Sequence, residues 1–179
     1  MKRLKGIIEM RNGLMTTASG LGLAAVMVLA SSPGAHAQTA TANLPVTANV
    51  AQKCTIATTP LNFGEYDPVQ NHLSNPLDAT GTVIVRCTQG ATVNIGLDQG
   101  DNASGATRRM IDGTNMLTYQ IYSDANRTQV WGNAAPTWLT PPPAPSTAAR
   151  IFTVYGRVFA AQDVSLGTYR DIVEATVNF

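Results

Sequence analysis

The sequence predicts an all-β chain folded as a two-layer sandwich of the immunoglobulin-like kind. After residue 37 almost every segment is typical of a short strand bounded by turn residues, and no stretch of a dozen residues keeps a helical period. Seven or eight such strands in the 142 remaining residues (179 less 37) suit a sandwich. A small closed barrel is the competing architecture, which periodicity alone does not exclude.

Residues 1–37 have the pattern of a secretory signal peptide. An apolar stretch runs from Leu14 to Ala30, and Ala35-His36-Ala37 has the small-x-small form of a cleavage site. The basic residues before the stretch are Lys2, Arg3, Lys5 and Arg11. A transmembrane anchor is the alternative, but about 17 apolar residues broken by Thr and Gly are at the short limit for a span. We expect the exported chain to begin at Gln38.

Cleavage would also change the charge of the chain. It removes four of the twelve basic residues and one of the eleven acidic ones, which leaves eight against ten and a net charge of −2. Because there is no basic run, we expect no nucleic-acid partner. By length the exported chain is one domain, 51–179, preceded by the segment 38–50.

The segment 38–50 alternates between apolar and polar residues, as a strand does. Its apolar face includes Ala42, Leu44, Val46, Ala48 and Val50. Thirteen extended residues span roughly 43 Å at about 3.3 Å each, which is longer than a usual strand. Pro45 lies on the polar face and removes one ladder donor. After cleavage nothing upstream remains to pair with this strand.

Cys54 and Cys87 are the only cysteines, and an even pair in an exported chain favours one disulfide. Such a bond would stabilise the fold by roughly 3 to 4 kcal/mol in the chain-entropy model. A catalytic or metal-binding pair is the alternative. The chain has no CxxC and no second ligand cluster to support it, so we expect neither a metal nor another cofactor.

Turn residues separate the strands that we expect in the domain. The expected strands are 54–57, 61–63, 81–88, 92–97, 115–123, 128–131, 150–159 and 168–179. The segment 136–149 differs, because five prolines in fourteen residues favour an extended surface loop. Such a loop is a variable connection or, with Trp138 exposed, a recognition loop.

The last expected strand also lacks an obvious partner. Its apolar face consists of Val173, Ala175, Val177 and Phe179, and the chain stops there without a polar tail. An immunoglobulin-like sandwich that lacks its final strand exposes core residues and unpaired backbone groups in a groove. The segment 38–50 of one chain could fill the groove of the next, and repetition would give a head-to-tail filament.

An enzyme is the main alternative class. The acidic residues occur mostly in turns, where Asp bonds the local backbone, and His72 has no evident Ser or Cys partner. The sequence lacks a nucleophile elbow, an HExxH motif and a phosphate loop, so we expect no catalytic site. A ligand surface is a further alternative, but we expect the tyrosines and Trp131 in or beside the core and the arginines in solvent. The residues concerned are Arg108, Arg109, Tyr119, Tyr122, Trp131 and Trp138.

Four segments in order carry a resemblance to a known family. They are PLNFGEYDP (60–68), GTVIVRCT (81–88), RRMIDGTNMLTYQIYSDANRTQVWG (108–132) and FTVYGRVFAAQDVSLGTYRDIVEATVNF (152–179). Together they resemble the spore coat U domain family, which includes the pilins of archaic, Csu-type chaperone-usher pili. The resemblance covers essentially Gln38 to Phe179.

The resemblance implies a pilin that is exported to the periplasm and ends in a cell-surface pilus that supports adhesion or biofilm formation. A periplasmic chaperone would lend a strand to the groove, and at an outer-membrane usher the donor strand of an incoming pilin subunit would replace it. Residues 38–50 would be that donor. The strand with Val173, Ala175, Val177 and Phe179 would be the acceptor edge that the chaperone contacts. A coat protein assembled without an usher and a tip-proximal adhesive subunit are the alternatives.

Overall fold

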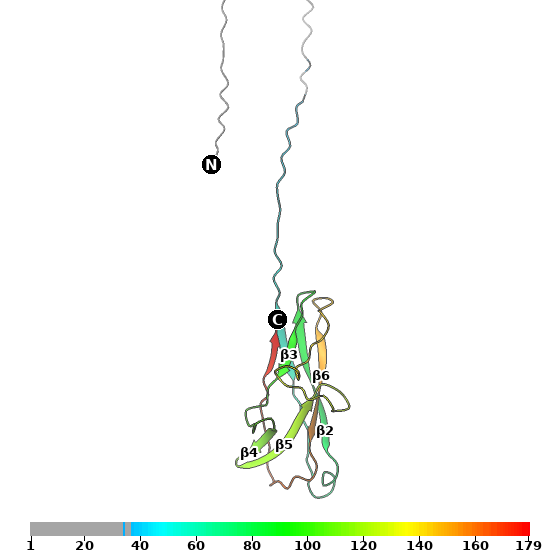
Figure 1. The fold of residues 1–179 in the computed structure, drawn as a ribbon, viewed down its shortest axis with the longest axis vertical. Helices are drawn as coiled ribbons and strands as arrows, with labels where there is room; N and C mark the ends of the chain where they lie inside the picture. Colours follow the sequence, from blue (N-terminus) through cyan, green and yellow to red (C-terminus); the bar gives the residue numbers. More distant parts are fainter. Residues whose placement is uncertain (1–33, 35–36) are drawn as a thin grey trace, which may run out of the picture. The chain divides into compact units, whose positions relative to one another are not determined.

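Figure 1 shows the computed structural model, which describes residue 34 and residues 37–179. The predicted signal segment lies outside the described residues, except for residues 34 and 37. The chain divides into two units, Met1–Val46 and Thr47–Phe179. In the first unit, residues 34 and 37–46 are exposed and form no helix or strand. In the described part of the chain, no helix is long and apolar enough to cross a membrane.

The second unit is all-β, as the sequence predicts, and is built from two antiparallel sheets. Its strands are β1 (Cys54–Thr59), β2 (Leu77–Cys87), β3 (Asn94–Leu97), β4 (Arg108–Asp112), β5 (Asn115–Tyr122), β6 (Arg150–Val158) and β7 (Ala175–Asn178). One sheet has the order β1-β2-β6-β5-β4, and the other pairs β3 with β7. Since the two sheets do not join into a ring, the architecture is a sandwich and not a closed barrel.

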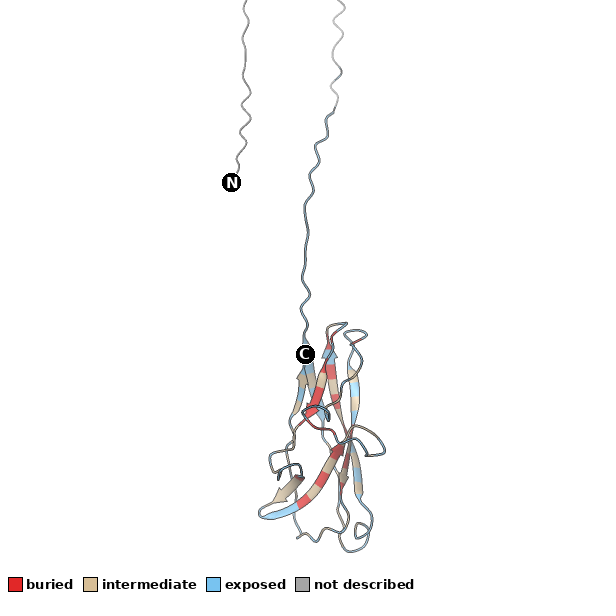
Figure 2. Ribbon diagram, viewed as in Figure 1, coloured by how far each residue is buried: buried red, intermediate tan, exposed pale blue. Residues whose placement is uncertain are grey.

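The core lies between the two sheets because alternate residues of each strand point inward (Figure 2). The buried apolar residues of the strands are Val83, Val85 and Cys87 of β2, Ile95 and Leu97 of β3, Leu117, Tyr119 and Ile121 of β5, and Val154 and Val158 of β6. Trp131, from the long connection between β5 and β6, is also completely buried, and its Nε1 donates to the carbonyl of Ile95 at 2.9 Å. The prediction that Trp131 belongs to the core is therefore confirmed.

The strand β4 is missing from the sequence prediction. Two adjacent arginines precede Met110, so the segment shows no clean apolar alternation. It pairs with β5 because a two-residue turn joins them, with Asp112 opposite Asn115 and Gly113 at a φ of +59°. Glycine accepts that left-handed conformation without steric cost. Turn residues therefore separate the two strands here as they do elsewhere in the chain, but the first of the two is not among the strands expected from the sequence.

Two short predicted strands do not form, and a third is shorter than predicted. Residues 61–63 cross the inner face of the sheet, where a Cβ at Gly156 would lie 2.7 Å from Leu61 and Phe63, so they pack by side chains. Residues 128–131 make a single bridge, Tyr122 to Val130. The predicted strand 168–179 keeps ladder geometry only in β7, preceded by the isolated bridge Ile111 to Arg170.

Candidate functional site: a groove between two free strand edges

β1 and β7 are edge strands that lie next to each other without a ladder between them. In an antiparallel pair, successive residues alternate between bonding the partner strand and pointing away from it. The N–H of Asp98 donates to the carbonyl of Glu174, so Glu174 is one of the β7-side residues that bond the β3 side. Ala175 and Val177 therefore direct their backbone groups away from β3. The bond from Thr88 to Lys53 does the same for β1, whose Ile56 and Thr58 point away from β2. Two sets of backbone donors and acceptors therefore flank the gap.

The two edge strands run in opposite directions. The disulfide joins Cys54 at the start of β1 to Cys87 at the end of β2, and Gln52 reaches the carbonyl of Thr92. Asn94 of β3 pairs with Asn178 at the end of β7. The start of β1 and the end of β7 consequently lie at the same end of the sandwich, where Figure 1 places the C-terminus. We call this the disulfide end.

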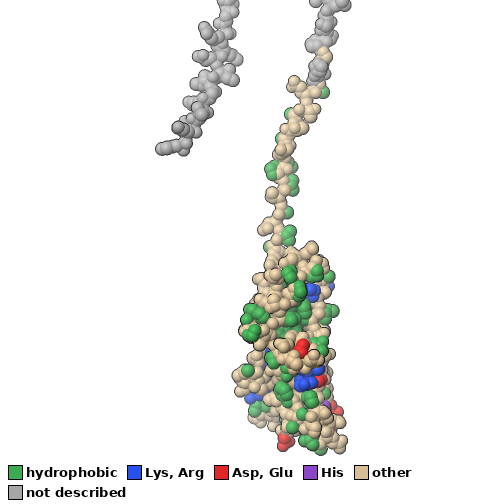
Figure 3. Space-filling model, turned by 45° about the vertical axis from the view of Figure 1, so that its right-hand side comes forward, with side chains coloured by type: hydrophobic (Ala, Val, Ile, Leu, Met, Phe, Trp, Pro, Cys, Tyr) green, Lys and Arg blue, Asp and Glu red, His purple; other side chains and the backbone are tan. Residues whose placement is uncertain are grey.

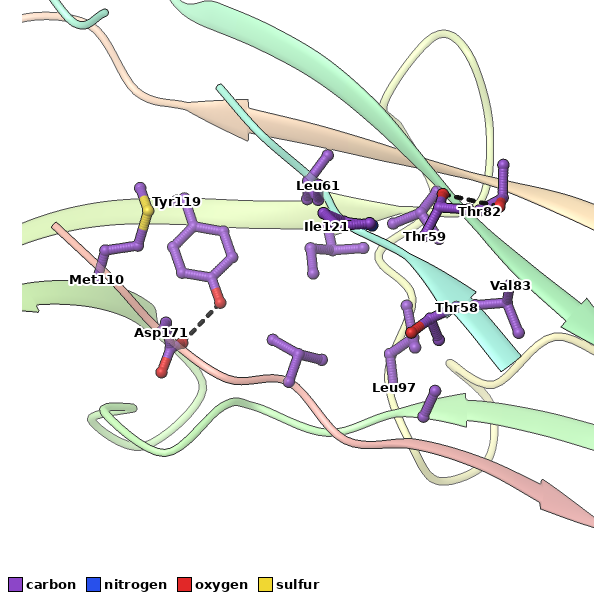
Figure 4. A pocket seen from close by; sticks show the side chains of 14 residues that line it. Thr58, Thr59, Leu61, Thr82, Val83, Leu97, Met110, Tyr119, Ile121 and Asp171 are labelled. Carbon is purple, nitrogen blue, oxygen red and sulfur yellow. Dashed lines mark hydrogen bonds between the residues drawn. The ribbon is translucent and has the colours of Figure 1, made fainter. Parts of the chain in front are cut away.

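A groove of about 200 Å³ opens between these edges and reaches the core. Its walls come from the end of β1 with Pro60 and Leu61, and from Asp171, Val173 and Ala175. Its floor includes the side chains of Leu97, Met110, Tyr119 and Ile121 (Figure 4). Val154 also lines it. Because an engineered cavity of about 150 Å³ accepts a benzene molecule, this volume suits one or two aliphatic side chains. The lining is apolar except near Thr58, Thr59, Thr82, Tyr119 and Asp171.

A second hollow, of about 750 Å³, adjoins the groove at Pro60, Leu61 and Met110. It is lined by residues 60–68 and 164–169 together with Leu77, Leu117 and Val158. This hollow lies away from the disulfide end, because it includes the start of β2 and the residues before β7. The two hollows thus meet beyond the end of β1 and the start of β7, and the second one also has polar lining residues such as Glu65 and Asp67.

Tyr119 and Asp171 make a polar contact at the side of the groove. The Tyr119 hydroxyl donates to Asp171 Oδ2 at 2.6 Å, and Figure 4 shows the two side chains pointing toward each other. Burial, strengthened by this bond, raises the pKa of Tyr119, so the phenol stays protonated. The other carboxylate oxygen accepts from the backbone N–H and the side-chain amide of Asn102. The contact fixes residue 171, and with it the approach of the chain to β7.

Arg108 is completely buried, so the expectation of solvated arginines is wrong for this residue. Its Nη2 donates to the carbonyls of Leu97 at 3.0 Å and Trp131 at 2.8 Å, and its Nε donates to that of Asp98 at 2.9 Å. Gln120 Oε1 accepts a further bond. Burial lowers the pKa of the guanidinium, but from a value so high that the charge remains. The chain uses this cation to bond carbonyls of β3 and of the connection after β5.

The disulfide between Cys54 and Cys87 is present, which confirms the predicted pairing. Val173, Ala175 and Val177 are half-buried against the core, and Val173 and Ala175 line the groove. Phe179 is 59% exposed. The expected donor residues Ala42, Leu44, Val46, Ala48 and Val50 are all exposed. The structure therefore brings the acceptor residues 173–177 to one edge, while the roles of both sets stay predictions.

The remaining candidate residues have local structural roles. Asp67 accepts the N–H groups of residues 69–71, which lowers its pKa, and Asp124 caps residues 128 and 129 in the same way. His72 stacks on Tyr66 at 5.0 Å, and its Nδ1 accepts the N–H of Asp67. Tyr122 and Trp138 are half-buried. Within residues 34 and 37–179, no three His, Cys, Asp or Glu side chains are placed to hold a metal ion.

Lys, Arg, Asp and Glu side chains are scattered over the face shown in Figure 3, and neither sign gathers into a continuous patch. The ion pairs found among the described residues form one cluster on the outer face of the five-stranded sheet. There Asp78 contacts Arg127 at 3.2 Å and Arg157 at 2.7 Å. The bond from Arg157 lowers the pKa of Asp78. The face shown in Figure 3 therefore has no charged patch that would be an alternative candidate site.

Comparisons with a family model, with known proteins and with solved structures each find a relative. The model of the Spore Coat Protein U domain family matches residues 40–176. Protein U of Myxococcus xanthus is 40% identical over 188 aligned positions, which cover 94% of this chain and 99% of that protein. The fold is similar to that of a chain in the crystal structure of the CsuC–CsuE chaperone–tip adhesion subunit pre-assembly complex from the archaic chaperone-usher Csu pili of Acinetobacter baumannii. That match has a TM-score of 0.50 and 20% identity, and it covers 73% of this chain but only 40% of the other, so the chain spans less than half of its length.

Proposed function

Because the chain belongs to the Spore Coat Protein U domain family, we propose that it is a structural subunit that polymerises by donor-strand exchange into a chaperone-usher pilus. One observation carries the proposal: two strand edges with outward backbone groups flank an apolar groove, and an alternating segment precedes the first of them. In this proposal the donor is 38–50 and the acceptor domain is 51–179.

The donor segment would supply the groove with apolar side chains and with backbone hydrogen bonds. Its apolar residues lie two apart, as do the inward residues Val173, Ala175 and Val177 of the acceptor edge. Burial of four or five aliphatic side chains would contribute roughly 5 to 10 kcal/mol before the cost of ordering the segment. The donor backbone would bond β7 on one side. Pro45 would remove one of these bonds, and its ring would stay on the outer face.

Insertion also requires movement of the acceptor. β1 and β7 approach within 8 Å between Cα atoms, whereas strands on either side of an inserted strand lie roughly 9.6 Å apart, twice the usual spacing. The two edges must therefore separate when a third strand enters between them. A chaperone that lends its own strand would hold the groove open until the donor replaces it, which explains why assembly would need a chaperone.

The proposal implies a route through the cell and a set of partners. The signal segment directs the chain to the periplasm, where a chaperone captures it. An outer-membrane usher then joins subunits head to tail, and the polymer stands on the cell surface, where it supports adhesion or biofilm formation. The proposal needs no cofactor and no catalytic residue.

The family description favours a second candidate, a structural coat protein that polymerises without an usher. Both candidates use the groove, but only a pilin depends on capture by a chaperone. Expression with and without the chaperone therefore separates them, since a coat protein would reach its final assembly in either case.

Removal of residues 38–50 tests the donor assignment. We expect the shortened chain to bind the chaperone as well as the complete chain does, because the groove is intact, but to form no polymer. Copurification measures the first property, and size-exclusion chromatography with electron microscopy measures the second. Polymers of the shortened chain would contradict the assignment.

A matched pair of variants controls for the loss of length. Leu44→Asp with Val46→Asp charges the apolar face of the donor, and Thr41→Asp with Thr47→Asp adds the same charge to the other face. We expect only the first pair to abolish polymers, because a carboxylate would have to enter the apolar groove without a partner.

A further inference from the structure

Residues 51–53 continue the line of β1 beyond the disulfide and are bonded to residues 88–92. The N–H of Thr88 donates to the carbonyl of Lys53 at 2.9 Å, and the N–H of Lys53 donates to Thr88 Oγ1 at 3.1 Å. The Thr88 hydroxyl in turn donates to the carbonyl of Ala51 at 3.2 Å, with a longer contact to that of Lys53. Gln52 Nε2 donates to the carbonyl of Thr92 at 3.1 Å. We call residues 51–53 with these bonds the exit clamp.

The exit clamp lies at the disulfide end, where β1 begins and β7 ends. For residues 38–50 to fill the groove of their own chain, the backbone would have to reverse within 51–53 and return alongside β1. The inserted strand would then form a hairpin with β1. Hairpin loops of two to five residues are common, so three residues would suffice if they were free to turn.

The exit clamp opposes this reversal. A turn at 51–53 would break the bonds to Thr88 and Thr92, because a reversed backbone cannot continue the ladder of β1. The disulfide strengthens the clamp, since it holds Cys54 beside Cys87 and thereby keeps Lys53 beside Thr88. The Thr88 hydroxyl both accepts and donates, so its removal would loosen residues 51 and 53 together.

We infer that the exit clamp commits residues 38–50 to the groove of a second copy of this chain by opposing insertion into their own. The inference rests on the proposed function and deepens it. A donor from another copy reaches the groove without any turn at its own residues 51–53. The clamp therefore suppresses a closed monomer, which would otherwise compete with polymerisation.

The test compares the exported chain, Gln38–Phe179, with the double variant Thr88→Val and Gln52→Ala. Hydrogen exchange of residues 38–50 is measured in chaperone-free monomers separated by size-exclusion chromatography, and polymer yield is measured in parallel. We expect no protection of 38–50 in the unaltered monomer. In the double variant we expect protection in the monomer and about tenfold less polymer, because the side-chain bonds that oppose the closed monomer are lost. Thr80→Val, at an exposed threonine of β2, is the control and should behave like the unaltered chain.

A second variant keeps the test decisive if the double variant does not fold. Insertion of Gly-Ser-Gly between Val50 and Ala51 leaves the clamp intact but provides a free turn, so protection of 38–50 in the monomer should again appear. Protection in the unaltered monomer would overturn the inference, as would unaltered behaviour of the folded double variant or, failing that, of the insertion variant. Polymers of the chain without 38–50 would instead overturn the proposed function, so the two failures are distinguishable.

Discussion

Arg108 places a positive charge in the core, and its hydrogen bonds serve three carbonyls, those of Leu97, Asp98 and Trp131. Arg108→Met would fill much of the same space but leave these carbonyls without a donor. Because each buried group left unpaired costs about 1 to 3 kcal/mol, we expect the free energy of unfolding to fall by about 3 kcal/mol or more. Urea denaturation followed by tryptophan fluorescence measures the change.

The neighbouring Arg109→Met is the matched control. Arg109 is half-buried and donates to the carbonyl of Asn102, which lies in a surface loop. We expect a loss within about 1 kcal/mol, as for a partly exposed hydrogen bond. Equal losses in the two variants would contradict the assignment of Arg108 as a bond donor to the core.

Residues that follow the alternating pattern could be predicted from the sequence, and Arg108 could not. Val83, Val85, Tyr119 and Ile121 lie on apolar faces of period two, so their burial follows from the strand alone. An arginine is buried only where several acceptors converge on it. Those acceptors belong to residues 97–98, 120 and 131, which are separated from one another in the sequence. No local sequence pattern therefore predicts that Arg108 is buried.

In the proposed assembly β7 is the edge that a chaperone or a donor would bond, and its two faces differ. Val177 is half-buried against the core, whereas Thr176 is exposed. We expect Val177→Asp to prevent stable chaperone capture, because the carboxylate would be buried without a partner under the inserted strand. Thr176→Asp adds the same charge to the outer face and should be captured normally. Copurification with a coexpressed chaperone measures both, and unchanged capture of the Val177 variant would contradict the acceptor role.

Elements were predictable where periodicity and turn signals agree. β2, β5 and β6 combine β-branched or aromatic alternation with clear turns, and each lies within a few residues of its predicted range. β4 has a turn signal but begins with two arginines, so its sequence does not predict a strand. Residues 61–63 look like a strand, yet Gly156 provides a depression into which Leu61 and Phe63 pack, and side-chain packing replaces pairing.

The groove forms only when both sheets have packed together. Its walls come from β1 and from the residues around the start of β7, and its floor comes from both sheets. The sequence predicts that a groove exists, because it contains an apolar terminal strand and a spare alternating segment. It does not predict the lining, because Thr58, Pro60, Leu61 and Met110 meet only after the sheets pack. The polar contact between Tyr119 and Asp171 depends on the same packing, joining residues 52 apart in the chain.

A peptide of residues 38–50 should stabilise the chain that lacks them, because a ligand that binds only the folded state shifts the unfolding equilibrium. At a peptide concentration of 100 times Kd the gain is about 2.7 kcal/mol, which raises the urea midpoint measurably. Binding should be slow, since β1 and β7 must separate before a strand enters. A peptide with Leu44→Asp and Val46→Asp is the control, and an equal shift of the midpoint by both peptides would show that the groove does not recognise the apolar face of the donor.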